Sequence, residues 1–427
     1  MTAADTPPKP VAIEPGTIRG RTIICLANRW DYDPTSKHQV MKVLSRRNQI
    51  LWVNYRGTRT PRATASDLAA VLATLRHVLG GVRRVSDSIV QMTPLVVPGG
   101  RTGWRGALNR RLLVAQIRRA LAALPRRPVQ LWTFAPDVAD LAGEFDEECL
   151  IYYCVDEYSA FEDFDGPAIR AAEDRLIRRA DAVITTSASL YESRRQRHPA
   201  TYLVRHGVDV RHFARALEED TETPPEIADL PRPVFGFFGL LQHWFDVRLM
   251  AQVARARPDA SFVLLGECQA DVAALQTLPN VHLLGRQPYA TLPAWCRAFD
   301  AALLPFRINE MTVNINPIKL REYLAAGLPV ISTALPEVRR YEPDVLIAHD
   351  AAEFCRHCDV AAALSSPEHR RRRSAMMNGE SWETVVERLS WIVQSALGRG
   401  DPAAQPPPAC PPPVAPPAEP ELVGSAI

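Results

Sequence analysis

Short apolar runs alternate with amphipathic stretches along most of the chain. Apolar runs of roughly four to eight residues predict buried strands, and apolar positions three or four apart predict helices. Helices of this kind are expected at 38–47, 167–179, 247–257 and 289–299. Strands that alternate with helices predict parallel sheets covered on both faces. The predicted strands lie at 21–28, 50–54, 88–92, 129–133, 150–155, 182–186, 234–238, 261–265, 281–284, 301–304, 328–331 and 345–348.

The pattern divides the chain into two α/β halves of similar size. The stretch 214–233 is acidic and contains prolines, so a linker is predicted there. The expected fold class is two doubly wound, Rossmann-like domains that face each other across a cleft. The predicted parts are a disordered N-terminus at 1–18, an N-terminal domain at 19–213, the linker at 214–233, a C-terminal domain at 234–365, helices at 366–398 that cross back to the N-terminal domain, and a disordered proline-rich tail at 399–427.

One strand–loop–helix–strand unit, residues 305–333, carries the clearest chemical signals. Asn316 is a predicted helix cap, Pro317 suits the first helical position, and Gly327 suits the residue just past the helix end. Lys319 lies in the first turn, where a cation and free amides favour a phosphate. Glu322 follows one turn later and can accept hydrogen bonds from sugar hydroxyls. This unit therefore predicts a binding site for a nucleotide diphosphate sugar.

Composition narrows the classes of partner and site. The formal net charge of +2 argues against a nucleic-acid-binding protein, and 47% hydrophobic residues suffice for real cores. The eight cysteines are scattered, which predicts reduced core residues and a cytoplasmic location. A Cys-x-x-Cys pair at 355–358 lacks a second pair at metal spacing, and the Asp-x-Asp pairs at 31–33 and 163–165 are expected by chance in a chain this rich in aspartate. No metal site is predicted.

Residues 101–127 form a predicted basic helix with eight arginines and no acidic residue. Its apolar residues recur at helical spacing, so it can lie on an anionic membrane surface as a peripheral contact. A surface helix whose apolar stripe packs on the sheet explains the pattern equally well. The sequence leaves both alternatives open.

The order of several motifs resembles the retaining glycosyltransferases of family 4, which have the GT-B fold of two Rossmann-like domains. The resemblance spans roughly residues 21–397. It points toward a bacterial subgroup that includes teichuronic-acid-type and exopolysaccharide transferases. Residues 381–383 are similar to the start of the terminal helix that returns to the N-terminal domain in this family. All segments that carry the resemblance are 152–157, 206–209, 236–239, 244–246, 258–266, 280–285, 316–331 and 381–383.

The resemblance implies the role of specific residues in donor binding. Glu322 matches the second glutamate of the Glu-x7-Glu motif that binds the donor ribose, whereas Asn314 stands where the first glutamate is usual. His243 and Trp244 stand where the family has Lys-Gly, so Lys319 and Arg248 are candidates to supply positive charge instead. No cofactor is implied beyond the nucleotide-sugar substrate. The other implied donor contacts are Thr312, Asn316, Ile318, Gly239, and Arg286 and Pro288 in the loop that contacts the base.

The first half offers candidates for catalysis and acceptor binding. Asp156, with Glu157 as second choice, ends an apolar strand where a side chain would face the cleft, and family members place a functional His or Asp nearby. The alternative for Asp156 is a cap on the turn after the strand. Arg29 and His38 follow the first strand, where phosphates or the acceptor would lie, although a solvated loop explains them equally well. His243 is a further weak candidate for the same role.

The sequence thus predicts a glycosyltransferase that moves a sugar from a UDP- or GDP-activated donor to a glycan or glycolipid, with retention, without a metal, and in bacterial surface polysaccharide synthesis. A dehydrogenase is disfavoured because no Gly-x-Gly-x-x-Gly follows a predicted strand. The alternative is a catalytically weak GT-B protein that binds a glycan or a partner, since the donor motif is altered at Asn314 and His243.

Overall fold

A computed structural model describes residues 17–55, 81–97, 103–161 and 164–398, which form two compact units. The described part of the first unit falls within Met1–Gly207, Val313–Asn316 and Trp382–Pro407. That of the second falls within Val208–Thr312 and Pro317–Ser381. Of the ends predicted to be disordered, 1–18 and 399–427, only residues 17 and 18 lie within the described residues.

The first unit is built on an eight-stranded sheet of order β3-β4-β2-β1-β5-β6-β7-β8. All neighbours are parallel except the edge pair β3 and β4. The strands are β1 Thr22–Ala27, β2 Gln49–Asn54, β3 Val82–Ser86, β4 Ile89–Met92, β5 Val129–Thr133, β6 Glu147–Cys154, β7 Ala182–Thr185 and β8 Thr201–Leu203. The helices are α1 Ser36–Ser45, α3 Gly103–Ala122, α4 Gly166–Ile177, α5 Ala188–Arg195 and α14 Trp382–Ala396, with short 3-10 turns η1 Ala139–Leu141 and η2 Tyr158–Ala160.

Alternate residues of each central strand point to opposite faces of this sheet. On one face, Ile24 and Leu26 of β1 join a core with Leu113 and Ile117 of α3. The intervening residues of β1 are also fully buried, because α1 and α14 pack together in the same unit and α14 contacts β6 and β7. The sheet is therefore covered on both faces, which is why its strands read as continuous apolar runs.

The second unit is built on a six-stranded, fully parallel sheet of order β11-β10-β9-β12-β13-β14. The strands are β9 Val234–Phe238, β10 Ser261–Leu265, β11 Val281–Leu283, β12 Ala301–Leu304, β13 Val330–Thr333 and β14 Val345–Ala348. The helices are α6 Val210–Ala214, α7 Pro225–Ala228, α8 Val247–Ala256, α9 Ala273–Gln276, α10 Leu292–Ala298, α11 Ile318–Ala325, α12 Ala351–Ala363 and α13 Pro367–Met376. The 3-10 turns are η3 Arg215–Leu217, η4 Tyr289–Thr291, η6 Pro336–Tyr341 and η7 Met377–Glu380, and η5 Thr312–Asn314 lies where the chain passes between the units.

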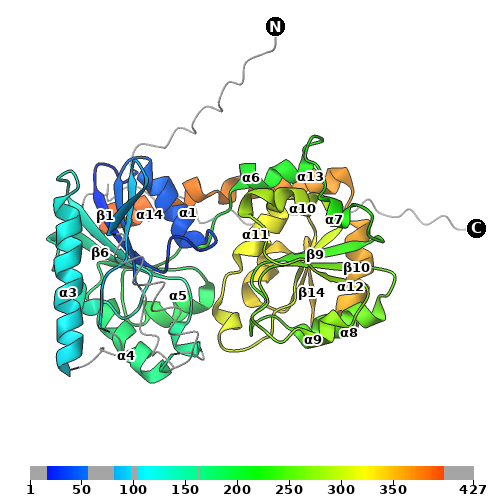
Figure 1. The fold of residues 1–427 in the computed structure, drawn as a ribbon, viewed down its shortest axis with the longest axis horizontal. Coiled ribbons are helices and arrows are strands. Elements are labelled where there is room, and N and C mark those ends of the chain that lie inside the picture. The colour runs from blue at the N-terminus through cyan, green and yellow to red at the C-terminus, as the bar shows by residue number, and fades with distance from the viewer. Residues whose placement is uncertain (1–16, 56–80, 98–102, 162–163, 399–427) are drawn as a thin grey trace, which may run out of the picture. The chain divides into compact units, whose positions relative to one another are not determined.

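Two helical layers cover the second sheet. Helices α8, α9 and α12 pack together on one face, and α6, α10, α11 and α13 pack together on the other (Figure 1). The chain enters these two layers from β9 and β12, which are neighbours in the sheet. The carboxyl ends of β9 and β12 thus form the topological switch point, where doubly wound sheets bind ligands.

The predicted domain limits differ from the observed units. Residues 214–233 are not a linker: η3 and α7 form there, and Ala216 and Ile227 are buried in the second unit. The stretch 366–381 also stays with the second unit, and the chain returns to the first unit only at Trp382. The helices within 214–233 were not predicted because prolines and acidic residues surround the few buried side chains there.

Helix α3 lies within the predicted basic helix. Leu113, Val114 and Ile117 are buried against the sheet, so the packed alternative holds for the second half of the helix. Near its start, Trp104 is 71% exposed and Leu108 is 37% exposed. The packed alternative is therefore confirmed for the second half of the helix, and a membrane contact of its start stays a prediction.

Candidate functional site

Helix α11 and the turn after β9 form a small cationic site in the second unit. Gly239, in that turn, has φ +131°, and a Cβ placed there would lie 1.9 Å from Cε of Lys319. The lysine side chain of α11 therefore lies directly over the turn, and only glycine leaves room for it. Tyr323 of α11 fixes the same turn, because its hydroxyl accepts a hydrogen bond of 3.0 Å from the backbone N–H of Phe238.

The start of α11 differs from that of most longer helices in this chain. Helices α4, α5, α8, α12 and α13 each have an Asp or Ser side chain that accepts a hydrogen bond from a first-turn amide. The N-cap of α11 is Pro317, which has no side-chain cap bond. The expectation that Asn316 caps this helix is therefore wrong. The helix end follows the prediction, since Gly327 just past it has φ +80°. First-turn amides without a side-chain cap, next to a lysine, suit an anion.

Glu322 is the acidic partner in this site. Its side chain is buried, and no hydrogen bond to its carboxylate comes from the described residues. Burial raises the pKa of Glu322 to about 7, the Lys319 ammonium opposes this rise, and Asp209 adds to it. A carboxylate with free acceptor positions in a buried place can bind the hydroxyl groups of a ligand.

A buried network holds the opposite side of α11. The Nε of Arg321 donates to Glu380 at 2.7 Å, and the hydroxyl of Tyr341 donates to the same carboxylate at 2.7 and 2.9 Å. Arg321 is only 1% exposed, so its charge is compensated inside the protein. The network fixes the rotation of α11 and with it the positions of Lys319 and Glu322.

In the first unit, polar side chains gather at the carboxyl ends of β1, β5 and β6. Asp156 follows β6, is half-buried, and its carboxylate accepts no hydrogen bond from the described residues. The predicted alternative, that it caps a turn, is therefore not what this structure shows. Burial raises the pKa of Asp156, while the Lys37 ammonium opposes that rise and Glu157 adds to it.

Lys37 is the functional candidate that the sequence reasoning missed. It lies in the first turn of α1, with its Nζ 3.4 Å from Oδ1 of Asn28 and 5.9 Å from the ring centre of Phe134. Burial lowers the pKa of Lys37, whereas Asp156 and Cys25 oppose that fall. Its position one residue before His38 was the only available signal, because the sequence does not reveal which of the two side chains points to the strand ends.

Glu157 does not serve as a second catalytic carboxylate in this structure. It accepts hydrogen bonds of 2.6 Å from Arg194 and 2.6 Å from Ser159. The Arg194 guanidinium is buried and also binds Glu173 at 2.9 and 3.0 Å. Burial favours the neutral acid, but these hydrogen bonds and the Arg194 charge keep the pKa of Glu157 below its usual value. Its role is structural.

The structure also differs from the prediction that His38 contacts phosphates or the acceptor. It is 2% exposed, its Nδ1 accepts from the Thr35 backbone N–H at 3.1 Å, and its ring stacks on Trp52 with centres 4.8 Å apart. Burial, together with Lys37 and Lys42, lowers the pKa of His38 to about 4, so it is neutral at pH 7. The phosphate or acceptor role is therefore wrong for His38.

The remaining weak candidates stay predictions. Arg29 lies 3.6 Å from Asp31 and over the ring of Tyr32, so it has local partners. His243, in the turn between β9 and α8, packs edge-on against Trp244. Arg286 and Pro288 are exposed in the loop after β11, and Ile318 is half-exposed at the first position of α11.

Three predicted donor residues lie elsewhere than expected. Thr312 is fully buried and donates to the carbonyl oxygen of Arg307, so it shapes its own loop and is unavailable to a donor. Asn316 is buried, and its side-chain amide donates to the Thr186 carbonyl at 2.6 Å. Asn314 accepts a hydrogen bond from the Ser189 hydroxyl. Asn314 and Asn316 thus belong to the first unit, whereas Glu322 and Lys319 belong to the second.

Comparison with known proteins places the second unit in a sequence family and finds relatives of the chain. Residues 232–362 match the model of a family described as glycosyl transferases group 1. The chain is 24% identical over 282 residues to a protein named as the teichuronic acid biosynthesis glycosyltransferase TuaH of Bacillus subtilis (strain 168), an alignment that covers 61% of this chain and 70% of TuaH.

A second relative is 28% identical over 225 residues, covering 46% of this chain and 57% of that protein. It is a GDP-mannose-dependent monoacylated alpha-(1-6)-phosphatidylinositol monomannoside mannosyltransferase of Corynebacterium glutamicum. The match thus spans little more than half of that relative.

Solved structures share the fold at low sequence identity. An alpha,alpha-trehalose-phosphate synthase (UDP-forming) from Burkholderia vietnamiensis has a TM-score of 0.63 and 12% identity, with 89% of this chain and 99% of that chain covered. A sucrose-phosphate synthase from Thermosynechococcus elongatus has a TM-score of 0.62 and 14% identity, with 88% and 99% covered. The chain is a glycosyltransferase of GT-B fold, and its second unit carries a glycosyl transferases group 1 domain.

Proposed function

We propose that the chain transfers a sugar from a UDP- or GDP-activated donor to a glycan or glycolipid acceptor. The observation that carries the proposal is the placement of Lys319 over the Gly239 turn, at the start of a helix without a side-chain cap. A diphosphate bound there would meet an ammonium group and the positive end of the α11 dipole. Glu322, one turn deeper, would accept hydrogen bonds from the ribose hydroxyls.

The same groups explain how the bond to the leaving group breaks. The nucleoside diphosphate gains negative charge as its bond to the anomeric carbon lengthens, and fixed dipoles and cations stabilise that charge. Lys319 and the α11 amides supply this stabilisation without a metal. Independence from metal ions is therefore part of the proposal, and retention of the anomeric configuration is added to it from the resemblance to family 4.

The acceptor side of the proposal rests on the first unit. Asp156 would accept a hydrogen bond from the attacking hydroxyl, and Lys37 would keep that carboxylate ionised. One relative is named for teichuronic acid biosynthesis and another for a phosphatidylinositol mannoside, which supports a polysaccharide or glycolipid acceptor. We therefore place the activity in the synthesis of a bacterial surface polysaccharide or glycolipid.

A panel of UDP- and GDP-hexoses tests this function. We expect at least one donor to be hydrolysed slowly to the nucleoside diphosphate, to the same extent with and without EDTA. At donor concentrations below saturation, Glu322→Ala should slow this release by roughly 10- to 100-fold, because the ribose would lose its carboxylate partner. If no nucleotide sugar binds and Glu322→Ala changes nothing, the alternative of a glycan- or partner-binding module, suggested by Asn314 in place of glutamate, is correct.

We further propose that the start of α3 contacts anionic membrane. Two exposed apolar side chains lie there, Trp104 at 71% and Leu108 at 37% exposure, and Leu95 at 48% and Val96 at 43% are exposed in the segment before the helix. Residues 95–97 are attached to α3, because Gln116 and Asn109 each exchange hydrogen bonds with their backbone. Arg105, Arg111 and Arg119 are exposed on the same helix. Within the described residues, no helix is long and apolar enough to cross a bilayer.

Vesicle sedimentation tests this contact. Phosphatidylglycerol vesicles should bind the protein, and the binding should weaken with salt, since each arginine near an anionic surface contributes about 1 kcal/mol. Trp104→Ser should reduce the bound fraction without lowering the melting temperature, because this side chain is 71% exposed. Equal binding to phosphatidylcholine vesicles would refute the electrostatic contact.

A further inference from the structure

A polar pocket lies in the second unit, at the carboxyl ends of β12, β13 and β14. Its volume is about 820 Å³, which falls within the range of roughly 300–1,000 Å³ for small-molecule sites. Its walls come from the first turns of α8 and α12 and from the residues that follow β12, β13 and β14. Helices α8 and α12 cover the face of the sheet opposite to α11, so Lys319 and Glu322 do not line this pocket (Figure 1).

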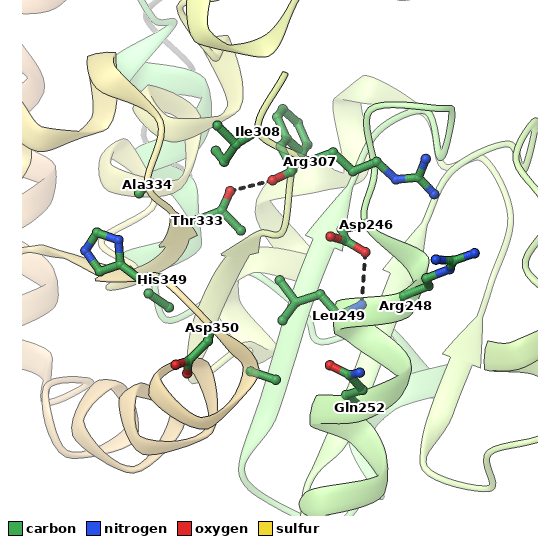
Figure 2. A pocket seen from close by; sticks show the side chains of 13 residues that line it. Asp246, Arg248, Leu249, Gln252, Arg307, Ile308, Thr333, Ala334, His349 and Asp350 are labelled. Atoms are coloured by element: carbon green, nitrogen blue, oxygen red, sulfur yellow. Dashed lines mark hydrogen bonds between the residues drawn. The ribbon is translucent and has the colours of Figure 1, made fainter. Parts of the chain in front are cut away.

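Two arginines on the pocket wall have no partner within the described part of the chain. The guanidinium groups of Arg248, in α8, and Arg307, after β12, form neither a hydrogen bond nor an ion pair there. Figure 2 shows both side chains extending to the same side of the pocket, with His349 and Asp350 on the opposite side. The expectation that Arg248 serves the donor phosphates at the α11 site therefore does not match its position.

The acidic residues of the pocket are already engaged. Asp246 accepts a hydrogen bond of 3.0 Å from the Leu249 N–H at the start of α8, and Asp350 accepts one of 2.8 Å from the Glu353 N–H at the start of α12. Each carboxylate is thus partly neutralised by the positive end of a helix dipole. The two guanidinium groups keep their full capacity for an anion, and planar guanidinium donors match the geometry of carboxylate and phosphate oxygens.

The rest of the lining is suited to a sugar ring rather than to a base. Gln252 and His349 are exposed and offer further polar contacts, and Ile308 is 52% exposed, which gives an apolar surface for ring C–H groups. Phe306 is only 4% exposed, so it offers no open face for stacking a nucleobase. The combination of two arginines without a partner among the described residues, further polar side chains and one aliphatic side chain is that expected for an anionic carbohydrate.

We propose that this pocket binds a sugar that carries an anionic group, either a carboxylate or a phosphate ester. That the bound sugar is a unit of the growing acceptor or product rests on the proposed transferase function; the binding itself does not. A site of this kind would make the enzyme prefer acidic glycans over neutral ones.

The test is a titration of the full chain without nucleotide, so that its result is independent of transferase activity. Glucuronate, glucose 6-phosphate, glucose and inorganic phosphate are added in turn, and the Nε–Hε signals of Arg248 and Arg307 are followed by NMR. These signals are assigned from Arg248→Gln and Arg307→Gln. At least one acidic sugar should shift both signals, while glucose should shift neither.

The double variant Arg248→Gln/Arg307→Gln should weaken that binding by at least about tenfold, since two charge-assisted contacts are lost. Arg255→Gln, an exposed arginine of the same helix outside the lining, is the matched control and should keep the wild-type affinity. The preferred acidic sugar tells a carboxylate site from a phosphate site. The proposal is overturned if no acidic sugar shifts the two arginine signals, or if inorganic phosphate binds as tightly as the acidic sugars.

Discussion

Replacing Lys319 by methionine should lower the affinity for UDP or GDP by roughly 10- to 100-fold, the equivalent of the 1.5–3 kcal/mol assigned to a hydrogen bond with a charged group. Methionine keeps most of the aliphatic chain that lies over Gly239 and removes only the ammonium group. The loss should therefore appear in the phosphate contact and not in the packing of α11. Calorimetric titration with UDP and GDP measures it directly.

The nucleoside provides the internal control for this experiment. If Lys319 contacts the diphosphate, uridine or guanosine should bind wild type and Lys319→Met equally, because neither carries a phosphate. Lys42→Met removes a lysine charge from α1 in the first unit and should leave both affinities unchanged. A loss of equal size for nucleoside and nucleotide would instead show that Lys319 merely shapes the site, and an unchanged UDP affinity would remove it from the donor site altogether.

The fully buried strands were the most predictable part of this fold. Val234–Phe238, Ser261–Leu265 and Ala301–Leu304 are buried at every position and have the predicted limits. A parallel strand covered on both faces needs apolar residues at every position, so its limits are written in the local sequence. The GT-B fold predicted from the resemblance is likewise confirmed by the solved structures.

Edge elements gave no such local signal. Strand β3, Val82–Ser86, was missed because its side chains are mostly exposed and its pairing with β4 is antiparallel at the sheet edge. The supposed linker contains α7, whose main local signal is one buried side chain, Ile227. Strand β3 and helix α7 both depend on contacts with residues distant in sequence, while their local composition is typical of a loop.

The site was predictable where its residues follow one another in sequence. Lys319 and Glu322 lie on one short helix and Gly327 follows its end, so their spacing fixes their relative positions. Asn316 was misassigned because its actual partner, the Thr186 carbonyl, lies 130 residues away. His38 was misassigned because its burial beside Trp52 depends on the pairing of β1 with β2. Tertiary contacts decide which polar side chains remain available, and a single sequence does not show them.

Replacing Asp156 by asparagine should lower kcat by about 10²–10⁴-fold, the range typical of groups that exchange a proton or a strong hydrogen bond in the transition state. Asparagine has nearly the same shape but does not take up the partial charge that develops as the acceptor hydroxyl attacks. The affinity for the nucleotide should not change, because the donor residues Lys319 and Glu322 belong to the other unit. Initial rates with saturating donor, together with the melting temperature, measure the effect.

Lys37→Met tests whether the charge of Lys37, and not only its shape, supports the Asp156 carboxylate. Burial raises the pKa of Asp156 and Lys37 opposes that rise, so removing the ammonium should raise the pKa further. The carboxylate is active when ionised, and the acidic limb of the pH–rate profile should therefore move to higher pH in Lys37→Met, with full activity regained at alkaline pH. Arg21→Met, which removes a cation paired with Glu148 elsewhere in the first unit, should leave the profile in place. A profile that does not move in Lys37→Met, or an active Asp156→Asn, would show that this carboxylate takes no part in the transfer step.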